Sequence, residues 1–353
     1  MKSLKILLIG YLPPPTGGVR VLFRQLTEEL NEENGVRLTV INLTGRRRGF
    51  IQKTLALSRG LLKALYHCFK VDVVSLQPTN LALVAVGPPI LLACRILKKP
   101  LVIRKFGGSF HEAFDNYPSL VRALLQATVF KASLWLLETH FLVNHFKHKI
   151  RNVAYYPNSR PVKAIALRES SRAVKFVFVS HISSGKGVKE LFEVSDRLPS
   201  PCQIDVFGPL GFDISKQHIH DLSKLHRADY KGELSPGHVM EVLKTYDVLL
   251  LPTCMRSEGY PGIILEAYSC GLPVIASNIG AIGEIVDSSC GVLVEPGDLD
   301  QLERAIVDIH LRQDLFQTLR LGAAQKARQF DSRRWTKEFL HYCKELYETG
   351  TIN

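Results

Sequence analysis

Two glutamates, Glu258 and Glu266, stand eight residues apart in the segment 257–277, which reads SEGYPGIILEAYSCGLPVIAS. Glu258 precedes a Pro-Gly turn, whereas Glu266 lies among apolar residues that the pattern predicts to form a helix beginning near Pro261. A buried carboxylate without a polar partner is costly, so Glu266 requires one. The two hydroxyls of a ribose would satisfy it, because an ionised carboxylate accepts several hydrogen bonds. A salt bridge to a neighbouring helix is the alternative.

The start of this predicted helix is also a candidate anion site. The backbone N–H groups of Gly262 and Ile263 would lie in the first helical turn, where such groups have no partner within the helix. The helix dipole adds partial positive charge at the same end. Glu258 would therefore stand at the mouth of an anion site, and capping of the helix is the alternative interpretation of this residue.

Two further loops carry candidate residues. In Ser180–Gly187, SHISSGKG, Lys186 lies at a glycine-flanked helix entrance that suits a diphosphate, although the spacing is not that of a P-loop and a surface lysine is the alternative. His181 suits the same anion or a strand cap. Gly17 and Gly18 follow the first predicted strand, where backbone N–H groups can meet a phosphate or sugar, with glycines that only permit a turn as the alternative. That loop lacks the GxGxxG of nicotinamide dehydrogenases.

These loops belong to a chain in which strands and helices alternate throughout. Runs rich in Val, Ile and Leu predict strands at 4–10, 36–43, 71–77, 101–106, 134–140, 175–180, 203–208, 247–252, 272–277 and 291–296. Such alternation predicts parallel sheets covered by helices on both faces. Ligands of such sheets bind beyond the carboxyl ends of the strands, which is where the candidate loops lie.

Length and charge divide the chain into halves. The 353 residues suffice for two domains, and the polar segment 156–172 with its two prolines is the predicted linker. Residues 1–165 hold 24 Lys and Arg against 8 Asp and Glu, whereas 166–353 hold 21 against 25. The basic half predicts a nucleic acid, an anionic membrane surface or a phosphorylated substrate as its partner, with solubility as the alternative. The seven scattered cysteines predict neither disulfides nor a zinc site and favour a reduced, cytoplasmic chain.

The segment 257–277, preceded by YDVLLLPT and followed by IGAIGEIV and GVLVEPGD, resembles the C-terminal domain of the retaining, nucleotide-sugar-dependent glycosyltransferases of family four, the group 1 glycosyl transferases. The E-x7-E spacing is the signature of that family. FVFVSHISSGKGVKEL resembles its strand with Gly-Arg and Lys-Gly residues, and DYKGELSPGHVMEVL resembles the turn and helix before the signature. The resemblance is close over 175–311 and looser in the first half, through PPPTGG and YYPNSRP.

The resemblance implies an α/β protein of GT-B architecture, with two Rossmann-like domains whose parallel sheets face across a cleft. Residues 1–165 would form the acceptor-side domain and 166–353 the nucleotide-sugar donor domain, with the last helix a candidate to cross back to the first. Carried over by position, Glu266 would hold the ribose and Glu258 the sugar hydroxyls. The remaining donor contacts would be the Gly262 and Ile263 amides, the Lys186 ammonium at the diphosphate, and Gly17 and Gly18 closing over the donor.

Two positions depart from the family pattern. His181, after Ser180, stands where the family has the arginine of its Gly-Arg pair. Phe106 stands where many members have a catalytic-site histidine, and His111 follows five residues later. His111 is therefore a catalytic candidate, with an ordinary surface histidine as the alternative.

The implied reaction is hexosyl transfer with retention from a nucleoside-diphosphate sugar to a glycan or lipid-linked acceptor, for surface polysaccharide or glycolipid synthesis. Lys186 and the helix end would stabilise the leaving phosphate, and neither a metal nor a further cofactor is required. A catalytically weakened sugar-nucleotide-binding partner subunit is the alternative. Nucleic-acid binding is disfavoured, since the basic half lacks interleaved aromatics and a recognisable module.

The segment 46–70 predicts contact with the inner face of an anionic membrane. It holds seven Lys and Arg and no acidic residue. Its apolar residues at helical spacing are Ile51, Leu55, Leu62, Leu65 and Phe69. The core-facing stripe of a surface helix is the alternative interpretation of this pattern.

Overall fold

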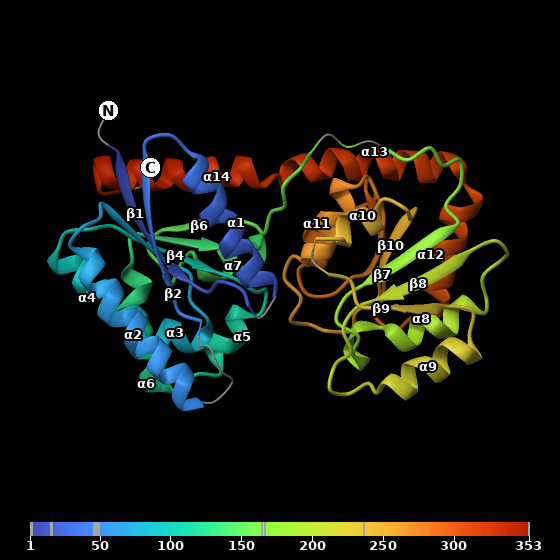
Figure 1. Ribbon diagram of the computed structural model, residues 1–353, viewed down its shortest axis with the longest axis horizontal. Coiled ribbons are helices and arrows are strands. Elements are labelled where there is room, and N and C mark those ends of the chain that lie inside the picture. Colours follow the sequence, from blue (N-terminus) through green and yellow to red (C-terminus); the bar gives the residue numbers. More distant parts are fainter. Residues whose placement is uncertain are drawn as a thin grey trace. The chain divides into compact units, whose positions relative to one another are not determined.

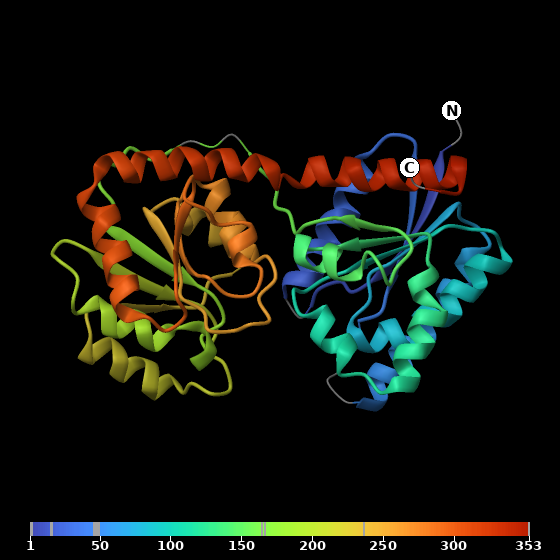
Figure 2. The ribbon, with the colours of Figure 1, turned by 180° about the vertical axis from the view of Figure 1, so that it is seen from behind.

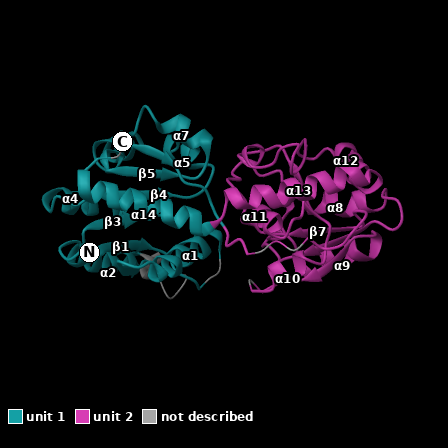
Figure 3. Ribbon diagram, turned by 90° about the horizontal axis from the view of Figure 1, so that it is seen from above, with its two compact units in different colours: residues 1–159, 332–353 teal, residues 160–331 magenta. Residues whose placement is uncertain are grey.

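The structure, a computed structural model, describes residues 3–14, 17–44, 50–163, 165, 167–235 and 237–351. The chain forms two compact units, unit 1 with residues 1–159 and 332–353 and unit 2 with residues 160–331 (Figure 3). The boundary precedes the expected one after residue 165, because Arg160 already donates its backbone N–H to Phe330 of unit 2. The C-terminal segment 332–353 belongs to unit 1, so the last helix returns to the first unit, as the sequence analysis allowed.

Unit 1 is built on a parallel sheet in the order β2-β1-β3-β4-β5-β6 (Figure 1). Its strands are β1 (Leu4–Gly10), β2 (Val36–Asn42), β3 (Val73–Leu76), β4 (Leu101–Lys105), β5 (Leu134–Leu137) and β6 (Val153–Tyr155). Its helices are α1 (Gly18–Glu32), α2 (Phe50–Cys68), α3 (Asn80–Ala85), α4 (Gly87–Ile96), α5 (Phe110–Asp115), α6 (Ser119–Ala127), α7 (His140–Phe146) and α14 (Ser332–Thr349).

Successive residues of β1 enter opposite cores of unit 1. Ile6 and Leu8 pack with Phe23 of α1 and Phe339 of α14 on one face. Leu7 lies in the core on the other face, together with residues of α2, α3 and α4. The strand is buried on both faces, which explains its uninterrupted apolar sequence. Among the described residues, no helix is both long and apolar enough to cross a membrane.

Unit 2 repeats this plan of a parallel sheet with helices around it (Figure 2), and its strands follow the order β12-β11-β10-β7-β8-β9. Its strands are β7 (Lys175–Val179), β8 (Gln203–Phe207), β9 (Asp229–Gly232), β10 (Val248–Leu251), β11 (Val274–Ser277) and β12 (Gly291–Val294). Its helices are α8 (Val188–Ser195), α9 (Lys216–Leu225), α10 (Val239–Leu243), α11 (Gly262–Ser269), α12 (Leu299–Leu311) and α13 (Gln313–Gln329).

All ten predicted strands are present, and the prediction of α/β units with parallel sheets is confirmed. Two edge strands, β6 and β9, were not predicted. Neither contains a buried residue, so neither shows the apolar run that marks the inner strands. The start of DYKGELSPGHVMEVL, expected as a turn and helix, is therefore strand β9, and the helix of that segment is the short α10.

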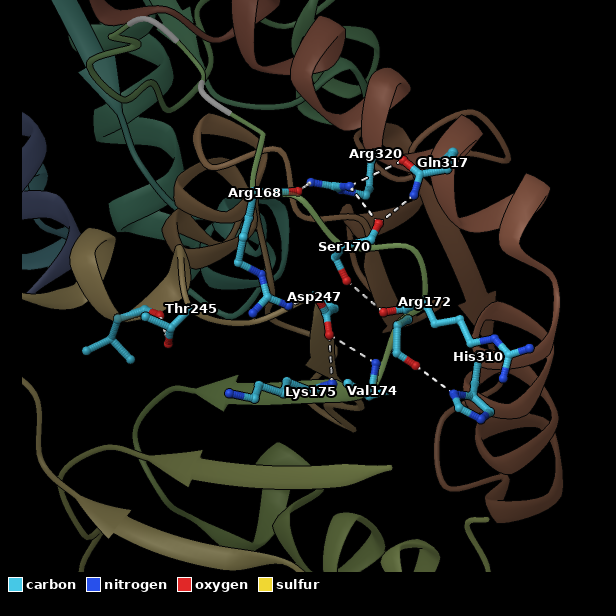
Figure 4. A network of polar contacts seen from close by, with 12 residues as sticks. Arg168, Ser170, Arg172, Val174, Lys175, Thr245, Asp247, His310, Gln317 and Arg320 are labelled. Carbon is cyan, nitrogen blue, oxygen red and sulfur yellow. Dashed lines mark hydrogen bonds and ion pairs between the residues drawn. The ribbon is translucent and has the colours of Figure 1, made fainter. Parts of the chain in front are cut away.

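The expected linker is fixed to unit 2 by a polar network (Figure 4). The Asp247 carboxylate accepts the backbone N–H groups of Val174 and Lys175 at 3.0 and 2.9 Å and forms an ion pair with Arg168. The Arg320 guanidinium donates to the backbone carbonyl of Arg168. These contacts satisfy buried polar groups of the expected linker and of the rest of unit 2. The segment therefore forms part of unit 2 and is not a free connection between domains.

Candidate active site

Helix α11 begins at Gly262, directly after Pro261, where the sequence predicted it. The Ile264 N–H donates to the Pro261 carbonyl at 3.0 Å. Ile264 and Leu265 face the core of unit 2, whereas Gly262, Ile263 and Glu266 remain partly accessible. The accessible side of the first turn thus carries the backbone amides and the carboxylate that the sequence singled out.

The carboxylate of Glu266 is paired with Arg160. Its Oε1 lies 2.6 Å from the Arg160 Nε, and the two side chains are only 20% and 10% exposed. Glu266 therefore has the polar partner that its position requires, supplied by the first residue of unit 2 rather than by a neighbouring helix. The Arg160 Nη2 would lie 2.0 Å from a Cβ placed on Gly262, so the guanidinium packs on the first residue of α11.

The carboxylate of Glu258 is paired with Lys186. The Lys186 Nζ donates to the Glu258 Oε1, and both side chains are mostly buried. The Thr253 hydroxyl lies 3.2 Å from the same Oε1 and 3.2 Å from the Gly185 carbonyl. Glu258 and Lys186, predicted as separate loop residues, are thus in direct contact at one end of the sheet.

Three loops after parallel strands converge on Glu258. Gly187, in the loop after β7, has φ +76°, and a Cβ there would lie 1.9 Å from the Pro252 carbonyl oxygen after β10. Only glycine allows both that backbone conformation and that close approach. In the loop after β11, the Ala281 N–H donates to the Glu258 carbonyl at 3.0 Å. The site therefore lies at the carboxyl edge of the sheet, where open α/β sheets bind ligands.

His181 lies in the same loop region but is exposed. The neighbouring Ser184 donates its backbone N–H and its hydroxyl to Asp213 at 2.8 and 2.6 Å. These hydrogen bonds lower the pKa of Asp213, and the nearby His181 contributes to that lowering. The loop is thus fixed to the segment after β8, and His181 faces solvent beside it.

Gly17 and Gly18 lie in unit 1 at the start of α1. Gly17 is the residue before the helix, with extended backbone at φ 177°, and Gly18 is the first helical residue. A Cβ on either would have no neighbour within 4 Å among the described atoms. Neither packing nor backbone conformation within unit 1 requires glycine at these two positions. Their predicted role at the donor is taken up below as a proposal.

His111 also lies in unit 1, in the first turn of α5. Its ring centre is 4.8 Å from that of Phe141 and 5.6 Å from that of His145, both in α7. Its Nε2 lies 3.9 Å from the Glu112 carboxylate. Burial, Lys149 and His111 lower the pKa of His145. The histidine thus belongs to a small aromatic cluster on α5 and α7.

Buried charges at the carboxyl edge of the unit 1 sheet were not predicted. Arg104 and Lys105 end β4, and Glu138 follows β5, and all three are buried. The Arg104 guanidinium lies 4.5 Å from the ring centre of Phe106, the residue at the expected histidine position, and 4.4 Å from that of Tyr156. Two consecutive basic residues inside an apolar strand were the only sequence signal for this cluster.

Arg160 and Thr253 are the residues of the unit 2 site that sequence reasoning missed. Arg160 lies in the segment predicted as a linker, and Thr253 follows β10 without a motif of its own. Their contacts to Glu266 and Glu258 join residues 106 and 5 positions apart. The first contact depends on the fold alone, so no local pattern announces it.

Comparison with known proteins gives this geometry its context. Residues 162–329 match the family described as Glycosyl transferases group 1. The D-inositol 3-phosphate glycosyltransferase of Saccharomonospora viridis is 31% identical over 205 residues, covering 54% of this chain and 47% of that protein. A GDP-mannose-dependent monoacylated alpha-(1-6)-phosphatidylinositol monomannoside mannosyltransferase of Corynebacterium glutamicum is 31% identical over 103 residues, 28% of this chain and 26% of that protein. The chain covers less than half the length of these curated relatives.

The fold comparison extends over the whole chain. The crystal structure of HepE from Anabaena in complex with UDP has a TM-score of 0.75 and 18% sequence identity, covering 97% of this chain and 100% of that one. That likeness establishes the arrangement of strands and helices, and the family match covers the unit that carries the paired glutamates. Residues 162–329 of this chain therefore match the group 1 glycosyl transferases, and the chain has the GT-B fold.

Proposed function

We propose that the chain is a retaining glycosyltransferase that moves a sugar from a nucleoside-diphosphate sugar to a glycan or lipid-linked acceptor, in surface polysaccharide or glycolipid synthesis. The observation that carries this proposal is the pair of carboxylates flanking the start of α11. Glu258 is paired with Lys186, and Glu266 is paired with Arg160. The match of residues 162–329 to the group 1 glycosyl transferases and this arrangement together favour a donor-binding site in unit 2.

In the donor complex, Glu266 would accept hydrogen bonds from the ribose hydroxyls, and Glu258 would accept them from the hydroxyls of the transferred sugar. Both carboxylates are fixed by ion pairs, so their oxygens are oriented before the donor arrives. The Gly262 and Ile263 N–H groups, at the positive end of α11, would meet the sugar or a phosphate. UDP in the structurally similar HepE supports a nucleoside diphosphate as the ligand class.

During transfer, the bond between the anomeric carbon and the diphosphate oxygen breaks, and the acceptor oxygen bonds to that carbon on the same face. The acceptor proton passes to the leaving phosphate. Negative charge grows on that phosphate in the transition state, where the Lys186 ammonium and the α11 end stabilise it. This scheme needs no metal and no cofactor beyond the sugar-nucleotide co-substrate.

Unit 1 would hold the acceptor. His111, in α5, is the proposed catalytic residue of that unit, and Gly17 and Gly18 are proposed to close over the donor. These glycines are exposed and leave room above the start of α1, as close approach to a ligand requires.

We also propose that unit 1 lies on the inner face of an anionic membrane as a peripheral, cytoplasmic protein. Of the predicted apolar stripe, Leu55, Leu62 and Phe69 are 50%, 68% and 70% exposed, and Leu65 is half-buried. The core-facing residues of α2 are instead Leu57, Ala64 and Cys68. The interpretation of the stripe as a core face is therefore wrong for its three exposed members.

A basic border accompanies the exposed stripe. Tyr66, 58% exposed, lies beside it, and the Lys70 ammonium is 4.0 Å from the Tyr66 ring centre. Arg59 and Lys63 are exposed on the same helix. Arg46, Arg47 and Arg48, and the side chains of Ile51 and Lys53, lie outside the described residues. An apolar stripe bordered by cations is the pattern of helices that lie in an anionic membrane interface.

A catalytically weakened partner subunit that only binds sugar nucleotides is the second candidate. It is favoured by Phe106 at the expected histidine position and by His181 at the expected arginine position. Phe106 is buried beneath Arg104 and offers no acid or base. The two candidates agree on donor binding and differ only in turnover.

The test is a thermal-shift screen of the full chain with UDP, GDP and ADP, followed by an assay of sugar release from the matching donor. A ligand that binds only the folded state raises its stability by RT ln(1 + [L]/Kd), about 2.7 kcal/mol at a hundredfold excess over Kd. A raised thermal midpoint of unfolding together with sugar transfer or donor hydrolysis supports the transferase. A raised midpoint without turnover supports the partner subunit, and no shift with any nucleotide refutes both.

A further inference from the structure

Helices α4 and α6 present apolar side chains to solvent. Leu92 and Ile96 are exposed on α4, and Leu120 and Leu124 are exposed on α6. The members of each pair are four residues apart, so they lie on one side of their helix. The inner sides of the two helices are filled by other residues, which are buried: Ile90, Leu91 and Cys94 of α4 and Leu125 of α6. The outer pairs therefore serve no core, and apolar groups gathered in this way mark an interaction surface.

Helices α4 and α6 cover the same face of the unit 1 sheet as α2 (Figure 1). Leu57 of α2, Ile90 of α4 and Leu125 of α6 belong to one buried core. Helix α2 packs on α4, and both α4 and α6 contact the 3-10 turn Val129–Lys131. Helices α1 and α14 belong to the core on the other side of the sheet. The exposed pairs thus lie on the same side of unit 1 as the exposed stripe of α2, and together they form the α2–α4–α6 face.

The charged residues of these three helices are all basic. Helices α2, α4 and α6 contain no aspartate or glutamate, and neither do residues 73–111 as a whole. Arg95 and Lys98 are exposed at the end of α4, as Arg59 and Lys63 are on α2. The helices on the other side of the sheet, α1 and α14, carry six glutamates: Glu28, Glu29, Glu32, Glu338, Glu345 and Glu348. The α2–α4–α6 face therefore combines apolar residues with positive charge that no acidic residue of its own helices offsets.

We propose that α4 and α6 contact the membrane together with α2, so that unit 1 lies on anionic lipid with a face of three helices. This inference rests on the membrane attachment proposed above for α2 and adds two helices to it. An anionic leaflet offers both partners that the face requires. Apolar side chains enter the boundary between headgroups and acyl chains, while the cations remain at the charged headgroups.

Other partners fit the α2–α4–α6 face less well. Two copies of the chain meeting through it would bring the cations of one copy against those of the other, and the three helices supply no carboxylate to pair with them. A nucleic acid would suit the cations, but its phosphate backbone dominates such binding and leaves exposed Leu and Ile side chains without partners. Anionic lipid matches the face in both respects.

The proposed face ends beside the carboxyl edge of the unit 1 sheet. Only residues 116–118 separate α6 from α5, the helix that contains His111. The Tyr117 hydroxyl donates to the Asn80 carbonyl at 3.3 Å, which fixes this connection to the start of α3. Leu81, next along α3, is exposed. A lipid-linked acceptor would therefore meet the proposed acceptor side of unit 1 at the border of the membrane face.

The test is sedimentation of the full chain with vesicles of phosphatidylcholine, alone or mixed with phosphatidylglycerol. Leu92→Gln with Ile96→Gln, and separately Leu120→Gln with Leu124→Gln, should lower the partition coefficient on the mixed vesicles about 10- to 100-fold, because each pair loses two apolar contacts. Leu311→Gln with Leu321→Gln is the matched control, since it changes two exposed leucines of unit 2. It should alter the partition coefficient by less than about twofold.

The outcomes separate this inference from the proposed function. If the α4 and α6 pairs bind the mixed vesicles as the parent does, the inference is overturned and attachment through α2 stands. A loss with only one pair removes the other helix from the face. If the parent binds neither kind of vesicle, the membrane attachment and this inference fall together, while the proposal of sugar transfer is unaffected. If the parent is a dimer that the α4 change dissociates, the face joins two copies and the inference is wrong.

Tryptophan fluorescence gives a second measurement that removes no apolar area. In Leu120→Trp the new indole replaces a leucine that is 84% exposed, so the fold should tolerate the change. Its emission should shift to shorter wavelength when the mixed vesicles are added, because the indole enters the membrane interface. Leu321→Trp in unit 2 is the control and should show no shift. A vesicle-bound Leu120→Trp chain without a shift would contradict contact through α6.

Discussion

Replacing Lys105 by methionine should remove a pH dependence of stability from unit 1. Lys105 is 6% exposed at the end of β4. Its ammonium donates to the Phe106 carbonyl at 3.0 Å and lies 5.3 Å from the Phe110 ring centre. Burial lowers the pKa of Lys105 from its ordinary 10.5 to about 8, and the Glu138 carboxylate partly opposes this lowering.

The sign of the effect follows from where the proton is held more tightly. The unfolded chain binds the Lys105 proton more strongly than the folded chain does, so between pH 8 and 10.5 it holds more protons. The free energy of unfolding therefore rises with pH through this window, and the gain is lost as the pH falls through 8. The separation of the two pKa values corresponds to on the order of 3 kcal/mol.

Thermal midpoints of the parent and of Lys105→Met, measured from about pH 7 to about pH 11, test this reasoning. For a unit of this size each kcal/mol corresponds to roughly 2–4 °C, so the parent should gain about 6–12 °C relative to the variant. Lys131→Met, which replaces an exposed lysine, is the control and should follow the parent. Parallel curves for parent and Lys105→Met would refute the assigned burial of an ammonium group.

Three other changes test contacts of unit 2. Asp247→Asn should lower the free energy of unfolding by about 3 kcal/mol in denaturant titrations, because the carboxylate is buried among two backbone N–H groups and Arg168. The control Asp314→Asn, at an exposed ion pair, should lower the free energy of unfolding by less than about 0.5 kcal/mol. Equal effects of the two variants would contradict the assigned burial of Asp247. Glu266→Ala should weaken nucleoside diphosphate binding roughly 30- to 150-fold by calorimetry, and unchanged binding by a folded variant rejects the ribose contact. Lys186→Ala should lower turnover more than nucleoside binding, and equal turnover removes Lys186 from the mechanism.

The sequence predicted the inner strands because burial on both faces leaves an uninterrupted apolar run. Leu134–Leu137 and Val248–Leu251 show such runs, and every residue of both is buried. The edge strands Val153–Tyr155 and Asp229–Gly232 pack on one side at most, and their half-exposed or exposed residues give no such signal. These two strands are recognised only by pairing with a neighbour, which depends on the fold, whereas the edge strands β2 and β12 carry runs of Val, Ile and Leu and were predicted.

The residues of the candidate site also fall into those with a local sequence signature and those without one. Glu258, Lys186 and the start of α11 were predictable, because helix entrances and glycine-flanked loops have local signatures. Arg160 was not, since its significance comes from a partner 106 residues away. The buried Lys105 was also missed, because a basic residue in a strand is ordinarily expected at the surface and only packing by Phe110 and neighbours reveals otherwise.

Membrane attachment through α2 should depend on both its apolar stripe and its cations. Burying an exposed Leu or Phe side chain in the interface contributes roughly 2 kcal/mol, and each basic residue near an anionic leaflet contributes about 1 kcal/mol. Leu62, Phe69, Arg59, Lys63 and Lys70 together therefore suffice for firm attachment that weakens as salt screens the charged part. The two contributions can be removed separately.

Flotation with vesicles of neutral lipid, or of neutral lipid mixed with an anionic phospholipid, separates them. The parent should float with the anionic vesicles at low salt and less at high salt, whereas a variant with Arg59, Lys63 and Lys70 changed to Gln should float less with the anionic vesicles and lose most of its dependence on salt. Leu62→Gln with Phe69→Gln should reduce flotation while a salt-sensitive remainder persists, because the cations remain. Changing Leu311 and Leu321 to Gln should leave flotation unchanged, because these two leucines of unit 2, 61% and 62% exposed, lie outside the apolar stripe of unit 1. If the control pair reduces flotation as much as Leu62→Gln with Phe69→Gln does, or if the parent never floats, this stripe is not a membrane surface and the basic charge of unit 1 must serve a soluble acidic acceptor.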